Sequence, residues 1–162
     1  MLDWIANTDY ATWVRQSWGW AVALTFHAFG TAMVVGLIFI IALRLMGFFR
    51  TIPYTSLNKL LPVIWIGVVI QVLSGATLWA SKPARYLADG MFQFKFLFVV
   101  AACGVTIYFQ QLLNRETPAW QSAGLVAVKG NTRVWVAVTT LLWAAVLVAG
   151  RLTAYLGQLY HA

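Results

Sequence analysis

The sequence has little negative charge and almost no cysteine. Of its 162 residues, four are Asp or Glu and one is Cys. A single cysteine cannot form an internal disulfide bond, which excludes a disulfide-stabilised secreted domain. Charged residues make up 9% of the chain, whereas an average soluble domain contains about 25%. This scarcity excludes both an ordinary soluble globule and a charge-rich disordered chain.

The chain is instead apolar and basic. Hydrophobic residues make up 62% of it, the mean hydropathy is +0.79, and 11 Lys and Arg residues give a net charge of +7. In a soluble protein this basic excess would suggest nucleic acid as a partner. Here the basic residues lie at the ends of apolar runs, where contact with membrane lipid explains them better. We therefore expect a lipid environment and no nucleic-acid partner.

Four long runs of the sequence contain no charged residue. A helix needs about 20 mainly apolar residues to span a membrane, within a range of roughly 17–25. We therefore predict an all-α membrane protein with one transmembrane domain over residues 1–162. The predicted transmembrane helices are Trp18–Leu45, Leu61–Ala80, Phe94–Leu113 and Val134–Tyr155. Because the connections between them are short, the helices should form an up-down-up-down four-helix bundle.

The segment before the first run has acidic residues, and its first basic residue is Arg15. A cleaved signal peptide needs a basic beginning, so we do not expect one here. Trp and Tyr side chains lie beside polar residues in this segment, a combination typical of the lipid headgroup level. We predict a short interfacial helix over Thr8–Ser17.

The connections between the predicted helices contain residues that favour turns. Proline, Gly-Asn and Asp-Gly occur in them, and we predict loops at Arg50–Leu60, Ser81–Gln93 and Arg115–Arg133. Basic residues are more numerous on the side of the membrane where the first predicted helix ends. The six on that side are Arg44, Arg50, Lys59, Arg115, Lys129 and Arg133. This bias predicts that side to be cytoplasmic and both termini to be periplasmic, in a bacterial inner membrane.

Polar residues of the four predicted helices converge on one half of the bundle. The alternating topology makes neighbours of His27, Gln71, Lys95 and Arg151, all in the half near the termini. Ionisable groups inside a membrane usually face the bundle interior and mark functional sites. Two plainer interpretations stay open: Lys95 and Arg151 could extend to the interface, and His27 could serve as a hydrogen-bonded helix contact.

The residue types in this half permit haem b. One histidine, small residues that admit a ring, and basic groups for the propionates would suffice. We therefore predict a cofactor site in which His27 binds the metal. Its further members are Gly30, Gln71, Gly75, Lys95, Arg151 and Tyr155. A second axial ligand is missing from the helices, and Lys95, water or a partner subunit could supply it.

Other chemistry finds less support in the sequence. No Asp or Glu lies in a predicted span, which argues against proton or cation pumping. Copper accepts soft Met and His ligands, and a scattered relay of His27, Met91 and His161 is conceivable. In the first helix, Ala28, Ala32 and Gly36 form a small-residue stripe that predicts close helix packing.

Several short motifs resemble a bacterial family of four-helix inner-membrane proteins of unknown function. They are Trp4-Ile-Ala-Asn-Thr with Tyr10, Arg15-Gln-Ser-Trp with Trp20, His27-Ala-Phe-Gly30, Leu43-Arg-Leu-Met-Gly47, Ser74-Gly75 with Leu78, Tyr86, Phe92 with Lys95, and Gly150-Arg with Ala154-Tyr155. More remotely, the chain is similar to the copper-resistance D membrane family and to the haem-dependent membrane protoporphyrinogen oxidase. These resemblances imply a four-helix core with a His in the first helix and a Lys in the third. In the comparison with the oxidase, His27 and Lys95 match its essential His and Lys.

Three functions follow as hypotheses. The first is a haem-b protein or subunit that passes electrons between a periplasmic partner and the quinone pool. The second is a cofactor-free accessory or anchor subunit of a larger membrane complex, and the third is copper handling. The first two imply a protein partner or a homo-oligomer in the membrane, with quinone as a further partner of the first. The first two favour an electron-transfer or accessory subunit over a stand-alone enzyme.

Overall fold

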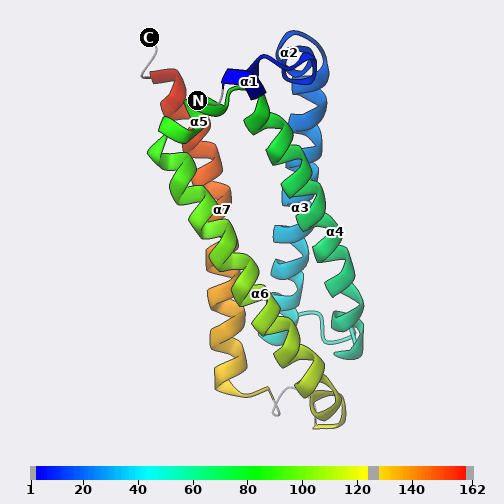
Figure 1. Ribbon diagram of the computed structural model, residues 1–162. Helices are drawn as coiled ribbons and strands as arrows, with labels where there is room; N and C mark the ends of the chain where they lie inside the picture. Colours follow the sequence, from blue (N-terminus) through cyan, green and yellow to red (C-terminus); the bar gives the residue numbers. More distant parts are fainter. Residues whose placement is uncertain (1–2, 124–127, 160–162) are drawn as a thin grey trace.

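The computed structural model describes residues 3–123 and 128–159, with side chains for residues 4–123 and 128–152. Its long helices are α3 (Gly19–Leu45), α4 (Thr55–Ser81), α6 (Gly90–Ala123) and α7 (Gly130–Leu159). They run side by side as an antiparallel bundle, each long and apolar enough to cross a membrane (Figure 1). The protein is therefore a multi-pass all-α membrane protein, as the sequence predicts.

Short helices cover one end of the bundle. They are α1 (Asp3–Ala6), α2 (Asp9–Gln16) and α5 (Pro83–Ala88) (Figure 1). We call this the α2 end. The Thr8 hydroxyl caps α2 by accepting a hydrogen bond from the Ala11 amide at 3.2 Å. Arg15 fixes α2 to the rest of this end by donating to the carbonyl oxygens of Ala6 (2.6 Å) and Ser81 (2.8 Å). The predicted interfacial helix is thus present and anchored.

Local sequence explains where the α3 and α4 helices stop. After α3, Gly47 adopts a φ of 103°, the left-handed conformation that ends many helices and that glycine adopts without strain. After α4, Lys82 leaves the helical region and Pro83 begins α5. A proline restricts the residue before it and is favoured at the first position of a new helix.

The loop predicted over Arg115–Arg133 is mostly wrong. Helix α6 continues through Pro118 to Ala123, and α7 already begins at Gly130. The charged residues at the ends of the predicted spans mark where each apolar run stops, but a charged residue does not end a helix. Buried Thr117 and Trp120 hold the last turns of α6 against the bundle despite the proline.

The bundle consists of two helical hairpins, α3–α4 and α6–α7, whose helices pack more extensively within each hairpin than between the hairpins (Figure 1). Helices α3 and α4 approach each other closely where Gly30 faces Gly67. A Cβ atom at Gly30 would lie 2.9 Å from the Gly67 carbonyl oxygen. The small-residue stripe predicted for packing instead faces outward, since Ala28, Ala32 and Gly36 are all exposed.

At the end opposite α2, a charged side chain lies in the core. Arg44 is 6% exposed, and its Nε donates to the Ile52 carbonyl oxygen at 2.6 Å. Its guanidinium lies 3.9 Å from the centre of the Tyr54 ring. Tyr54 also contacts Trp120 edge-on at 6.0 Å, and its backbone amide donates to the Gln121 side chain at 2.9 Å. Arg44 and Tyr54 thus join the α3–α4 connection to the end of α6.

Candidate functional site: an intramembrane histidine at an apolar cleft

His27 lies on α3, eight residues after the helix begins at Gly19. At about 1.5 Å per residue, this places it about 12 Å from the start of the helix. The side chain is half-buried and has a partner on each side. Its Nδ1 lies 3.0 Å from Ser74 Oγ on α4, and its Nε2 lies 3.4 Å from Lys95 Nζ on α6. The imidazole therefore connects the two hairpins.

The Ser74 hydroxyl decides which imidazole nitrogen carries the proton. Its single proton is donated to the Ile70 carbonyl oxygen at 2.6 Å. With its proton used in this way, Ser74 Oγ accepts the bond from His27, so Nδ1 carries the hydrogen and the lone pair of Nε2 faces the Lys95 amine. A hydrogen bond to one nitrogen in this way orients the imidazole and prepares the other nitrogen as a ligand or proton acceptor.

Lys95 reaches the imidazole from the opposite hairpin. Helix α7 leaves space for it, because a Cβ atom at Gly150 would lie 3.3 Å from Lys95 Nζ. No acidic residue occurs in the sequence between Asp89 and Glu116. The span that carries Lys95 therefore offers no carboxylate to its amine, which has three donors when charged.

Gln71, one turn before Ser74 on α4, has an incompletely satisfied amide. Its Nε2 donates to Thr31 Oγ1 at 2.6 Å, and the Thr31 proton is donated to the His27 carbonyl oxygen at 2.8 Å. Because the Thr31 proton is used in that bond, Thr31 Oγ1 can only accept from Gln71. The Gln71 amide is therefore oriented with its nitrogen toward Thr31. Gln71 Oε1 is buried and has no hydrogen-bond partner. A buried acceptor without a donor is costly, which suggests that a ligand or water completes it.

These groups meet at a cleft of about 510 Å³ between α4 and α6. Volumes of about 300–1,000 Å³ are typical of small-molecule sites. Its lining residues are His27, Gln71, Val72, Gly75, Ala76, Trp79, Leu87, Phe92, Gln93, Lys95, Phe96 and Val99. The walls are thus apolar and partly aromatic, with polar groups concentrated around His27. Exposed lining residues such as Val72 and Phe96 place its mouth on the outer surface of the spans, toward lipid.

Helix α5 lies at the α2 end of this cleft and contributes Leu87 to the lining. Its neighbour Tyr86 contacts Phe92 with ring centres 5.2 Å apart. Burial raises the pKa of the Tyr86 phenol above its ordinary value, while nearby Arg85 opposes that shift. Tyr86 is therefore held as a neutral phenol near the end of the cleft.

The structure brings together four of the seven predicted site residues. His27, Gln71, Gly75 and Lys95 all line the cleft. A Cβ atom at Gly75 would lie 3.3 Å from His27 Cε1, so this glycine makes room for the imidazole.

The other three predicted residues lie elsewhere. Gly30 is buried at the crossing of α3 with α4. Its close packing against Gly67 explains why a glycine is needed at this position. Arg151 is exposed on α7 and does not line the cleft. Tyr155 belongs to α7, but its side chain lies outside the described part of the protein.

Residues that support the site were not all among the predicted members. Ser74 and Thr31 are the hydrogen-bond partners that fix His27 and Gln71. Their helical spacing was a usable signal, since Thr31 is one turn from His27 and Ser74 is one turn from Gln71. Gly150 carried no such signal, because its role depends on the path of a side chain from another helix.

The described residues contain no group of three or more His, Cys, Asp or Glu side chains able to hold a metal ion. Any metal at His27 would thus depend on one protein nitrogen, a requirement that haem meets because its ring supplies the remaining in-plane ligands. His161 of the conceivable copper relay lies outside the described residues.

The fold and the site define a class, a four-helix multi-pass membrane protein with a His–Lys pair at an apolar intramembrane cleft. No known protein family, curated protein or solved structure matches the chain in the three comparisons made.

Proposed function

We propose that the protein is an electron-transfer protein or subunit of the membrane that binds haem b at the cleft. The observation that carries this proposal is the state of His27. Ser74 holds the imidazole by Nδ1, and the lone pair of Nε2 faces the cleft-lining Lys95 amine at 3.4 Å, which a bound iron would displace. A histidine held in this way would be oriented to bind the iron of a haem.

The other groups of the cleft fit the same cofactor. Lys95 would balance the charge of a propionate or, as a neutral amine, serve as a second ligand to the iron. Gln71 Oε1 can accept a hydrogen bond from a protonated propionate or a water. The phenylalanine and tryptophan walls suit the macrocycle. When bound, haem would supply reversible one-electron transfer.

The wider setting of the proposal follows from the bias of basic residues and from the resemblance in sequence motifs. We place the protein in a bacterial inner membrane with both termini in the periplasm. His27 then lies in the periplasmic half of the bundle, where electrons can pass between a periplasmic protein partner and the quinone pool. The bacterial four-helix family of unknown function is the relationship we propose.

A visible absorption spectrum tests the proposal. Protein purified in mild detergent from haem-replete cells should show a Soret band with about one haem per chain. We expect His27→Ala to abolish the band, because it removes the histidine that would bind the iron. Ser74→Ala should weaken haem affinity about 10–100-fold, since it removes the group that orients the imidazole.

Phe29→Ala is the matched control. Phe29 is on the same helix, 59% exposed and outside the lining of the cleft, so this variant should keep a normal spectrum. A wild-type protein without a Soret band, or a His27→Ala variant that retains it, would overturn the proposal. Co-purification of a stable partner with a colourless wild-type chain would instead support the cofactor-free accessory role, and bound copper would support the third hypothesis.

A further inference from the structure

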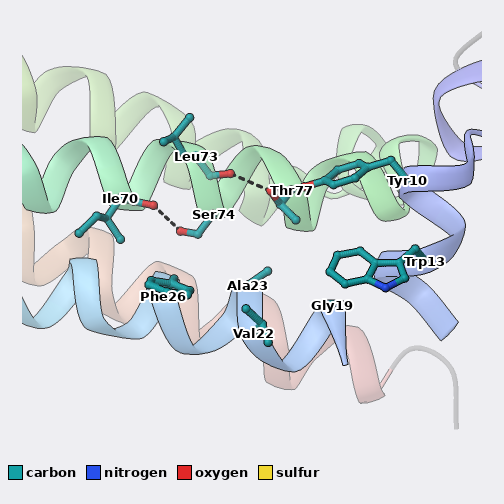
Figure 2. A pocket seen from close by; sticks show the side chains of 10 residues that line it. All are labelled: Tyr10, Trp13, Gly19, Val22, Ala23, Phe26, Ile70, Leu73, Ser74 and Thr77. Atoms are coloured by element: carbon teal, nitrogen blue, oxygen red, sulfur yellow. Dashed lines mark hydrogen bonds between the residues drawn. The ribbon is translucent and has the colours of Figure 1, made fainter. Parts of the chain in front are cut away.

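A second hollow lies on the other side of Ser74, between α2, α3 and α4 (Figure 2). It has a volume of about 440 Å³, which again suits a small molecule. We call it the Tyr10 groove. Its lining residues are Tyr10, Trp13, Gly19, Val22, Ala23, Phe26, Ile70, Leu73, Ser74 and Thr77. Phe26 and Leu73 are more than half exposed on spanning helices, so the groove is open to the hydrocarbon of the membrane.

Helix α2 supplies the end wall of the groove. A Cβ atom at Gly19 would lie 2.7 Å from the Trp13 ring, so the glycine lets the indole lie against the start of α3. Tyr10 reaches α4 and bonds Thr77 Oγ1 at 2.8 Å. The two aromatic side chains are those of an interfacial helix, so the groove extends from the headgroup level into the apolar region.

Three hydroxyl groups are the polar features of this groove, and their protons are all committed. Thr77 donates to the Leu73 carbonyl oxygen at 3.0 Å, and Ser74 donates to that of Ile70 at 2.6 Å (Figure 2). Because the Thr77 proton is used, Tyr10 must be the donor in the Tyr10–Thr77 bond. Toward an occupant of the groove, these hydroxyl oxygens can therefore act only as hydrogen-bond acceptors.

An occupant that suits such a groove has three properties. It is soluble in lipid, it has a flat ring that packs against aromatic and aliphatic side chains, and it carries hydroxyl groups that donate hydrogen bonds. A membrane quinol has all three. The oxidised quinone has only carbonyl acceptors, which would face acceptors here and remain unsatisfied. A plain acyl chain would leave the three oxygens unused.

We propose that the Tyr10 groove binds the ring of a membrane quinol and prefers this reduced form to the quinone. This binding does not depend on haem. Where the proposed function also holds, Ser74 gives the two sites a common wall, because this residue lines the groove and its hydroxyl bonds His27 at 3.0 Å. The quinol would then lie one hydrogen-bonded side chain from the imidazole.

The test compares the binding of decylubiquinol and decylubiquinone to the protein in quinone-free nanodiscs, without oxygen. Protein-free nanodiscs correct for partition into lipid. We expect the wild-type protein to bind the quinol about three- to tenfold more tightly than the quinone, the ratio that one additional hydrogen bond gives.

Thr77→Val makes the test specific. Valine keeps the shape of threonine but removes the acceptor of the Tyr10 hydroxyl, which then becomes free to donate to a quinone carbonyl. The preference for quinol should therefore disappear or reverse. Thr25→Val is the matched control, because Thr25 makes the same backbone bond, to the Ala21 carbonyl oxygen at 2.8 Å, on exposed α3 surface outside the groove.

Equal affinities for the two forms in the wild-type protein, or a Thr77→Val variant with the wild-type ratio, would overturn the proposal. Binding of neither form above the protein-free value would also overturn it and would assign the groove to lipid chains. A Soret spectrum of the same samples reports on haem separately. A colourless protein that prefers quinol would contradict the proposed function and leave this inference intact.

Discussion

Gly30→Ala is expected to lower the thermal stability of the protein strongly, although the change adds a single methyl group. The new Cβ would lie 2.9 Å from the Gly67 carbonyl oxygen and 3.1 Å from the Gln71 amide nitrogen. Both atoms belong to the backbone of α4, so they cannot rotate away and the two helices must separate. Overpacking of this kind costs about 1–3 kcal/mol. The unfolding midpoint of the purified protein in detergent measures it.

Gly36→Ala is the control for that substitution. Gly36 is on the same helix, and a Cβ atom there meets nothing within 4 Å. Alanine is favoured over glycine inside a helix by about 1 kcal/mol, so this variant should be as stable as the wild-type protein or more stable. If Gly30→Ala and Gly36→Ala melted at the same temperature, the close approach of α3 and α4 at Gly30 would be refuted.

Arg44→Ala is expected to destabilise the protein by about 3–5 kcal/mol. The substitution removes a charge-assisted hydrogen bond to the Ile52 carbonyl oxygen and the contact with the Tyr54 ring. Buried interactions of these two kinds contribute about 1.5–3 and about 2 kcal/mol respectively. Denaturation by graded addition of a harsh detergent would measure the loss.

Two further variants separate the causes. Arg50→Ala should change stability by less than about 0.5 kcal/mol, because Arg50 is exposed and its bond to the Gly47 carbonyl oxygen is 3.3 Å long. Tyr54→Phe should be neutral or stabilising, since the Tyr54 hydroxyl is buried without a partner while the ring keeps its contacts. A large loss in Tyr54→Phe would show that the hydroxyl, rather than the ring, is what the core requires.

The fold was predictable because the membrane imposes a strong pattern on the sequence. Uncharged runs located all four long helices, and the aromatic segment before them located α2. The ends of the helices were harder, because the apolar run stops at the edge of the lipid while hydrogen bonding continues. Buried Trp120 shows the reason: its contact with Tyr54 stabilises helical turns that the local sequence does not favour.

The candidate site was predictable in its depth but not in its detail. Alternating topology correctly placed His27, Gln71 and Lys95 together, because depth depends only on the count of residues from the membrane surface. Which face a residue occupies depends on the rotation of each helix. The stripe that ends at Gly36 faces outward and the single Gly30 faces α4, a difference that period-four spacing could not reveal.

The division into two hairpins has a consequence for biosynthesis. During translation, α3 and α4 leave the ribosome before α6 and α7, and closely packed antiparallel partners can associate as soon as both are inserted. His27 and Ser74 both belong to the earlier hairpin. The oriented imidazole can therefore exist in a half-synthesised chain, and the arrival of Lys95 with the later hairpin completes the pair.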